Sequence, residues 1–164
     1  MDPTTLTTYI AIPISFLLGG YQFAHSQNIL PTLHSLPVFV STPLFTQVYY
    51  SGFKIILPGA ILTAATYGYA AYRTTPQTGG GLLSRRNLLV FGAMCAIGVG
   101  AWTKIVMGAG VERVIAISKD AAMQVKAEES GKVLRLLKAW TGQNYVRPGI
   151  WVGAGVAGLL AVME

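Results

Sequence analysis

Long stretches without any charged side chain limit what this chain can fold into. No Lys, Arg, Asp or Glu occurs between Asp2 and Lys54, between Lys54 and Arg73, or between Arg86 and Lys104. A helix needs about 20 apolar residues to cross the hydrocarbon core of a bilayer, which is roughly 30 Å thick. These stretches and the apolar run near the C-terminus therefore predict four membrane-spanning helices, at residues 9–29, 53–72, 87–107 and 145–163.

The composition favours a membrane as the solvent. Hydrophobic residues make up 52% of the 164 residues and charged residues 11%, whereas an average soluble domain carries about 25% charged residues. Four apolar helices in sequence favour an up-down-up-down bundle, and glycines in the third and fourth spans suit close contacts between helices. We therefore expect an all-α membrane protein, a four-transmembrane-helix bundle in which residues 1–164 form a single integral membrane domain.

The connection between the third and fourth spans has a pattern of its own. Hydrophobic residues recur at near-helical spacing over residues 111–125 and again over residues 133–140, and Gly131 separates the two stretches. This spacing predicts two amphipathic helices that lie against the bundle or the membrane surface. The connection carries more Lys and Arg than the loop after the second span, which places it on the cytosolic side.

The sequence WTGQNYVRPG opens the fourth span with polar side chains. If the span started at Pro148 it would hold only about 16 residues, which is short for a bilayer. We therefore expect the helix to continue from residues 132–139 with a kink at the proline, which would free the carbonyl of Asn144. Trp140, Asn144 and Arg147 follow one another at spacings of four and three residues, which places them on one helical face.

Polar and aromatic residues gather at one side of the predicted membrane. In an antiparallel bundle the first and third spans end on the side where the second and fourth begin. The residues at these four ends are His25, Gln27 and Asn28; Gln47, Tyr49, Tyr50 and Lys54; Trp102, Thr103 and Lys104; and Asn144 and Arg147. Ionisable groups within a membrane are costly and usually face the bundle interior or a cavity. This convergence predicts a pocket at that side.

Each of these residues also has a purely structural interpretation. Lys54, Lys104 and Arg147 could extend along the helix ends to the lipid headgroups. The tryptophans and tyrosines could form an aromatic belt at the membrane interface, and His25 could be an interior histidine with satisfied hydrogen bonds. The functional interpretation therefore depends on the whole group of residues and not on any one of them.

The sequence offers no ready metal or nucleotide site. Cys95 is the single cysteine and lies inside the third span, so neither a disulfide framework nor a cysteine-based metal site can form. His25 and His34 are nine residues apart with Pro31 between them, which is not a metal-ligand spacing. The dinucleotide-binding fingerprint is absent. We expect no metal site, while a site assembled from distant residues stays open as an alternative.

Four short motifs resemble a known family in their order and spacing. They are GGYQFAHSQNILPTL in the first span, QVYYSGFKIILPGAIL opening the second, WTKIVMGAGVERVI closing the third and WTGQNYVR opening the fourth. Together they are similar to the small four-span membrane proteins that include the fungal anthrone oxygenases, over nearly the whole chain. The chain departs from the family in having GAGVERVI where a Pro-Thr-Asn-like stretch is usual.

The resemblance implies oxidation of a polyketide anthrone, similar to emodin anthrone, to the anthraquinone with O2 and without flavin, haem or nicotinamide. Such a reaction needs a base, a partner for an enolate oxygen and a dry aromatic slot. We expect His25 to be the base, since imidazole titrates near neutral pH, and Arg147 with Asn144 to stabilise the enolate. The residues expected to bind the substrate are Trp140, Trp102, Tyr49, Tyr50, Lys54, Lys104 and Asn28.

The resemblance also bears on partners and location. It implies a small aromatic polyketide as the substrate, membrane lipid as the surroundings and no nucleic-acid partner, and it is compatible with a homo-oligomer. It further implies an integral membrane protein of the endomembrane system, such as the endoplasmic reticulum. Two other functions fit the same sequence pattern: a non-catalytic four-span protein that binds a lipid or small ligand, and a metal- or haem-dependent membrane oxidase.

Overall fold

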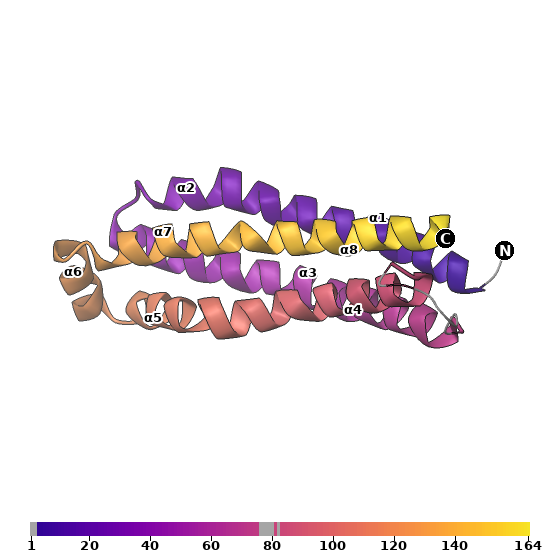
Figure 1. Cartoon of the computed structure of the whole chain (residues 1–164). Helices are drawn as coiled ribbons and strands as arrows, with labels where there is room; N and C mark the ends of the chain where they lie inside the picture. Colours follow the sequence, from indigo (N-terminus) through magenta and orange to yellow (C-terminus); the bar gives the residue numbers. More distant parts are fainter. Residues whose placement is uncertain (1–2, 76–80, 82) are drawn as a thin grey trace.

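Four long helical rods packed side by side form the molecule (Figure 1). The computed structural model describes residues 3–75, 81 and 83–164, and no strand occurs in those residues. In chain order the helical elements are α1 (Pro3–Ala24), η1 (His25–Ile29), α2 (Leu30–Leu33), α3 (Val38–Arg73), α4 (Arg85–Trp102), η2 (Thr103–Met107), α5 (Gly108–Ser118), α6 (Ala121–Glu129), α7 (Lys132–Asn144) and α8 (Val146–Met163). The prediction of an all-α four-helix bundle is confirmed.

Each rod is longer than the span predicted for it. The rods run over Pro3–Leu33, Val38–Arg73, Arg85–Ser118 and Lys132–Met163, and they contain 31, 36, 34 and 32 residues. By length and composition all four can cross a membrane, for which about 20 residues suffice. The additional turns extend the bundle mainly on the side where the second rod begins and the third ends, which is the side where the polar residues gather in the sequence.

The second rod begins at Val38, well before the predicted span at residue 53. Pro37 precedes it with an extended backbone (ψ 150°), and Pro43 lies inside the helix. Val38 and Phe45 are 7% and 0% exposed, in a buried cluster with residues of α5 and α7. Burial against these helices stabilises the extra turns, which a stretch rich in β-branched residues and proline does not predict by itself.

Two turns shape the segment between the third and fourth rods. Asp120 divides the predicted helix over residues 111–125 and caps α6, because its carboxylate accepts hydrogen bonds from the Ala122 and Met123 amides (2.8 and 3.1 Å). Gly131 adopts the left-handed conformation (φ 60°) that favours glycine, and it separates α6 from α7. As a result α5 continues the third rod, α7 continues the fourth, and α6 connects them (Figure 1).

The fourth rod is interrupted at a single residue. α7 ends at Asn144 and α8 begins at Val146, and between them the Tyr145 N–H donates a hydrogen bond to the Gly142 carbonyl (3.3 Å). The interruption falls before Pro148, which lies inside the first turn of α8. The helix therefore continues into the span as expected, but the irregular backbone is displaced toward Tyr145.

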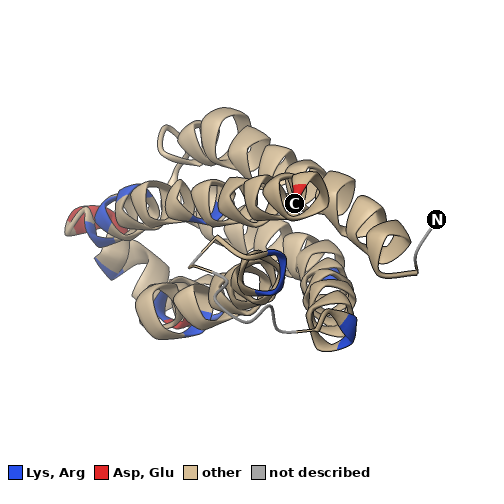
Figure 2. Ribbon diagram, turned by 45° about the vertical axis from the view of Figure 1, so that its right-hand side comes forward, with Lys and Arg blue, Asp and Glu red and all other residues tan. Residues whose placement is uncertain are grey.

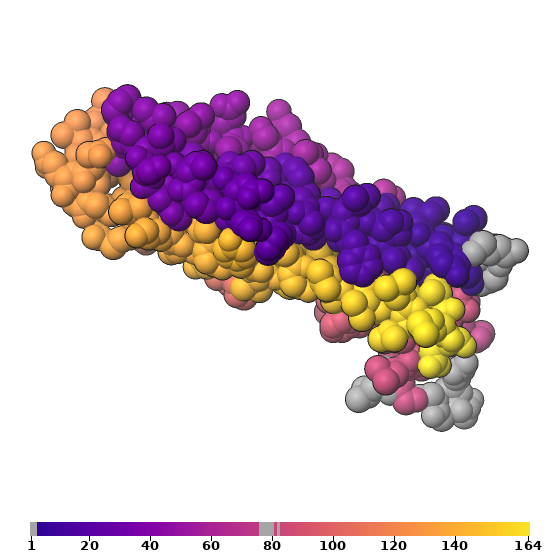
Figure 3. Space-filling view, turned by 90° about the horizontal axis from the view of Figure 1, so that it is seen from above, coloured from indigo at the N-terminus to yellow at the C-terminus, as the bar shows by residue number. Residues whose placement is uncertain are grey.

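Charged side chains lie mainly at the two ends of the bundle. Figure 2 shows most of the Lys, Arg, Asp and Glu residues around α6 and the adjoining ends of α5 and α7, with further Lys and Arg near the connection between α3 and α4. The middle of the rods carries few charges. Figure 3 shows α1 and α8 in contact along most of their length. This distribution fits a bundle that crosses a membrane with its charged ends outside the hydrocarbon core.

The half of the bundle nearest the two termini is closely packed. Tyr67 and Trp151 are fully buried there, and the Tyr67 hydroxyl donates a hydrogen bond to the Ala154 carbonyl (3.0 Å). A Cβ on Gly158 would overlap the Tyr67 hydroxyl, so this glycine leaves room for the tyrosine side chain that reaches from α3 to α8. The rods are held together at this end, and the interior space lies at the other.

Candidate active site

A cavity of about 420 Å³ lies in the half of the bundle nearer α6. All four rods contribute to its wall, through α1 with η1, through α3, through α4 with η2 and α5, and through the junction of α7 and α8. Its volume lies within the range of about 300–1,000 Å³ that small-molecule sites occupy. Seven of the ten site residues predicted from the sequence line it: His25, Tyr49, Tyr50, Lys104, Trp140, Asn144 and Arg147.

Two π-helical segments border the cavity. η1 interrupts the first rod at His25, and η2 interrupts the third rod at Thr103. A π turn widens the helix locally, and such segments are frequent at functional sites. His25, Thr103 and Lys104 all line the cavity, so both interruptions present side chains to the same space.

A chain of hydrogen bonds links the first and fourth rods at the cavity wall. Arg147 Nη1 donates to Asn144 Oδ1 (2.7 Å), and Asn144 Nδ2 donates to Ser26 Oγ (2.6 Å). The Ser26 hydroxyl in turn donates to the backbone carbonyl of Gln22 (2.8 Å). The Tyr145 hydroxyl adds a bond to the Ser26 carbonyl (3.3 Å). These bonds fix the guanidinium of Arg147 relative to η1.

Arg147 carries an uncompensated positive charge inside the cavity. Among the described residues no carboxylate lies within 4.0 Å of its guanidinium, and its Nε is buried without a hydrogen-bond partner. The ion pair at the cavity wall joins Lys104 and Glu112 (3.4 Å) and is largely exposed. A cation held by an amide, as Arg147 is by Asn144, keeps its charge available to a negatively charged ligand.

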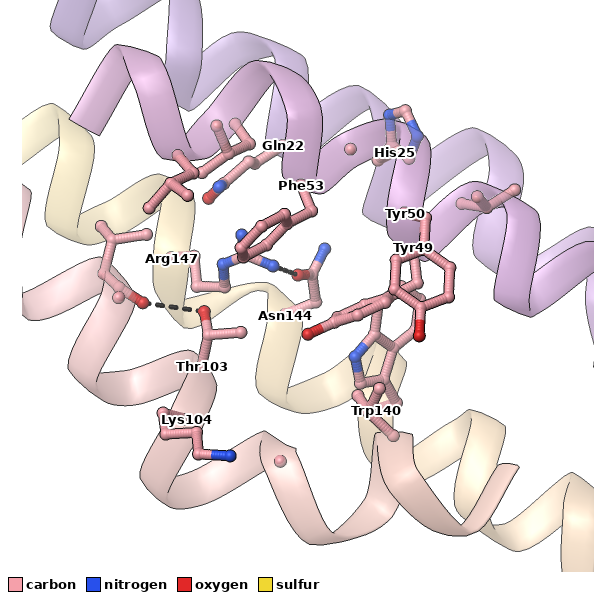
Figure 4. A pocket seen from close by; sticks show the side chains of 18 of the residues that line it. Gln22, His25, Tyr49, Tyr50, Phe53, Thr103, Lys104, Trp140, Asn144 and Arg147 are labelled. Atoms are coloured by element: carbon pink, nitrogen blue, oxygen red, sulfur yellow. Dashed lines mark hydrogen bonds between the residues drawn. The ribbon is translucent and has the colours of Figure 1, made fainter. Parts of the chain in front are cut away.

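Aromatic rings line the cavity beside this cation (Figure 4). Tyr49 is at the centre of the group, with its ring centroid 5.4 Å from that of Tyr50 and 6.5 Å from that of Phe53. Trp140 is 6% exposed and packs edge-on against Phe45 at 4.7 Å. The indole N–H of Trp140 is buried without a partner in the part of the chain that the structure describes. Such a wall suits a flat ligand with a few polar groups.

His25 supplies an imidazole to the cavity. Its ring is partly buried and lies 4.6 Å from the ring of Tyr21, centroid to centroid. Figure 4 shows it set apart from the pair formed by Arg147 and Asn144. The other histidine, His34, lies outside this cavity, where its Nε2 is 3.0 Å from the Thr141 hydroxyl. A flat ligand could therefore contact a base and a cation at separate places on its rim.

A family of known proteins matches the part of the chain that builds most of this site. The family model described as anthrone oxygenase matches residues 45–157. This chain belongs to the anthrone oxygenase family. The resemblance indicated by the four sequence motifs is thereby confirmed, while no curated protein and no solved structure matches the chain. Tyr49, Trp140, Asn144 and Arg147 lie within the matched residues, and His25 lies before them.

Three residues predicted for substrate binding do not line the cavity of this family member. Trp102 donates its indole N–H to the Gln143 carbonyl (3.1 Å) and so joins the end of α4 to α7. Lys54 and Asn28 are exposed on the outside of the bundle. Lys54 and Asn28 lie at the same level along the rods as the cavity, but their side chains do not face it. Lys104 does line the cavity, although its ammonium group forms the exposed ion pair.

The cavity also contains residues that the sequence did not single out. Gln22 and Phe53 line it, and Ser26 supports its wall through the hydrogen bonds described above. One signal was available, because His25 and Ser26 lie three and four residues after Gln22, spacings that bring each of them next to it on a helix. A glutamine and a serine on the same face as the predicted base, inside an apolar span, mark polar positions that face the interior.

No metal-binding cluster forms among the residues that the structure describes. They contain no group of three or more His, Cys, Asp or Glu side chains placed to hold one ion. Cys95 is partly buried in α4, where its Sγ would lie 3.9 Å from a Cβ on Gly153. The side chains that line the cavity include an imidazole, a guanidinium, an ammonium, a carboxylate, amides and hydroxyls.

Proposed function

We propose that this chain is an oxygenase that converts a polyketide anthrone, similar to emodin anthrone, to the anthraquinone with O2. Membership of the anthrone oxygenase family supports this class of reaction. The observation that carries the proposal is Arg147, a cation without a carboxylate partner among the described residues, beside aromatic rings and an imidazole in one cavity. An anthrone has the complementary features, namely an oxygen that becomes anionic, flat rings and an acidic methylene.

The proposed reaction starts with deprotonation of the methylene. The resulting anthranolate is electron-rich and transfers one electron to O2, and the radical and superoxide combine to form a carbon–oxygen bond. Proton uptake gives a hydroperoxide. Cleavage of its O–O bond, with loss of the remaining methylene proton, gives the quinone. The sum converts one anthrone and one O2 to one anthraquinone and one water.

The side chains of the cavity are assigned to these steps by their chemistry. His25 takes the methylene proton and returns it to the hydroperoxide, since an imidazole can do both near neutral pH. Arg147 stabilises the negative charge on the anthranolate oxygen, and Asn144 positions its guanidinium. Trp140 and Tyr49 enclose the flat rings and exclude water.

The surroundings of the protein belong to the same proposal. The substrate is a small aromatic polyketide, which dissolves in lipid, and four rods long and apolar enough to cross a membrane support a cavity that such a substrate reaches from the lipid. We propose that the protein lies in the endomembrane system and that O2 is the sole cosubstrate of its reaction. The side chains of the cavity provide a base and an electrostatic partner for such a reaction.

Oxidation of emodin anthrone by the purified protein in detergent tests this function. Formation of emodin is followed by its visible absorbance and O2 uptake by an electrode, with and without a strong chelator, and the spontaneous rate is subtracted. We expect acceleration by the native protein that survives chelation and is lost in Arg147→Ala. Acceleration that chelation abolishes would identify a metal-dependent oxidase. The absence of acceleration would favour a non-catalytic protein that binds a lipid or another small ligand.

A further inference from the structure

Gln22 is a buried amide whose two polar atoms have no partner among the described residues. It is 2% exposed and lines the cavity, and neither its Nε2 nor its Oε1 forms a hydrogen bond to any residue that the structure describes. An unpaired amide inside an apolar bundle costs free energy, because lipid provides no replacement for the missing hydrogen bonds. A side chain in this position has a donor and an acceptor available to a ligand.

At another point of the cavity wall, the Asn144 amide has a hydrogen-bond partner for each of its two polar atoms. Its Oδ1 accepts a hydrogen bond from Arg147 and its Nδ2 donates one to Ser26. Figure 4 shows Gln22 reaching from α1 into the part of the cavity that Arg147 also enters. The contrast indicates that the Asn144 amide holds the wall of the site together, whereas the Gln22 amide is available to bind a ligand.

The backbone holds Gln22 in register with Arg147. The Gln22 carbonyl accepts the Ser26 hydroxyl, which itself accepts the Asn144 amide, so this turn of α1 is tied to the residue that positions the guanidinium. Arg147 Nε is also buried and unpaired in the described part of the chain. Gln22 and Arg147 together therefore offer donors from both side chains and an acceptor from Gln22 alone.

We infer that Gln22 is a specificity-determining residue that recognises a carbonyl oxygen and a neighbouring hydroxyl group on the edge of the substrate. Its amide donates to the carbonyl oxygen and accepts from the hydroxyl, while Arg147 takes the charge that develops on that oxygen. A ketone without the hydroxyl would leave Oε1 unpaired, and sites built to bind a hydroxyl reject analogues that lack it. The inference rests on the proposed function and adds the selection of substrates to it.

The test compares two anthrones that differ only in these hydroxyl groups: unsubstituted anthrone, and dithranol, which has a hydroxyl on each side of the carbonyl. The ratio kcat/KM is measured for the native protein, for Gln22→Met and for the control Gln27→Met. Methionine keeps the length of glutamine without its hydrogen bonds, and Gln27 is exposed and outside the cavity.

We expect the native protein and Gln27→Met to prefer dithranol by at least about tenfold. Gln22→Met should lose this preference, because dithranol loses two hydrogen bonds from the amide and unsubstituted anthrone loses one, so kcat/KM falls much further for dithranol. A merely structural role would lower kcat/KM for both anthrones by the same factor. An equal fall for both substrates, or an unchanged preference, would overturn the inference.

Binding of the two product quinones separates this inference from the proposed function. Danthron, the quinone of dithranol, and unsubstituted anthraquinone are titrated into the protein, and quenching of tryptophan fluorescence is followed. If the native protein oxidises neither anthrone, the proposed function fails, but tighter binding of danthron that is lost in Gln22→Met still supports the role of Gln22. Equal binding of both quinones by the native protein overturns that role, even where Gln22→Met does not fold.

Discussion

The half of the bundle nearest the termini and the half nearest α6 use different residues at the contacts between the same four rods. Near the termini, Gly158 of α8 leaves room for the Tyr67 side chain of α3, and the interior is filled. Near α6, π-helical segments and large aromatic residues surround a cavity, and Asn144 and Arg147 form hydrogen bonds at its wall. The comparison indicates that tight contacts at one end hold the rods in place so that the other end can stay open.

Among substitutions in the cavity half, removal of the His25 imidazole should lower the catalytic rate most. His25→Ala is expected to lower kcat by about 10²–10⁴-fold, because general base catalysis contributes this much, while KM changes little. Steady-state oxidation of emodin anthrone measures both constants. His34→Ala is the matched control, since that histidine lies outside the cavity. An unchanged kcat in His25→Ala would rule out the imidazole as the base.

Removal of the guanidinium should affect both binding and turnover. Arg147→Ala is expected to lower kcat/KM by about 10²–10³-fold, which is the cost of losing one electrostatic partner of a developing oxyanion. Arg147→Lys should recover part of the activity, because it restores the charge without the planar hydrogen-bonding group. Arg86→Ala, at an exposed position near the connection of α3 and α4, is the control. Native activity in Arg147→Ala would contradict the assignment.

A substitution in the packed half should change stability without changing the chemistry. Gly158→Ala is expected to destabilise the fold by about 1–3 kcal/mol, because the added methyl group overlaps Tyr67 and Ile12. Thermal unfolding in detergent measures the loss, and kcat below the unfolding temperature should be native. Gly153→Ala is the control in the same helix, since its nearest neighbours would lie 3.9 Å away. Equal unfolding temperatures for the two variants would contradict the close contact.

The smallest effects are expected for the lysines of the cavity half. Lys54→Ala and Lys104→Ala should each change kcat/KM by less than about twofold, since Lys54 points outward and Lys104 forms an exposed ion pair of the kind that contributes little. The same assay with emodin anthrone measures these changes. A large loss in either variant would show that its ammonium group reaches the ligand and that the cavity extends farther than the lining residues indicate.

The sequence predicts the residues of the site correctly where their spacing along one helix determines which face they share. Trp140, Asn144 and Arg147 follow one another at four and three residues, and all three line the cavity. The level of a residue along the rod was also predictable from the uncharged stretches. The direction around the rod was not, as Lys54 shows: it directly follows the cavity residue Phe53 but is turned away from it.

Features that depend on contacts between distant parts of the chain could not be predicted. The bond between Ser26 and Asn144 joins residues that are far apart in the sequence, and no local pattern announces it. The early start of α3 at Val38 depends on burial against α5 and α7, which overrides a local preference against helix. The π-helical segments η1 and η2 likewise have no sequence signature as clear as a proline or a glycine cap.

The unpaired charge of Arg147 has a consequence for how a catalytic cycle ends. During the proposed reaction the ligand oxygen facing the guanidinium is negatively charged, and it is a neutral carbonyl in the finished quinone. The attraction that holds the anthranolate therefore weakens when the product forms. Because no carboxylate of the described chain competes for this cation, the neutral product can depart into lipid and the next ionised substrate restores the contact.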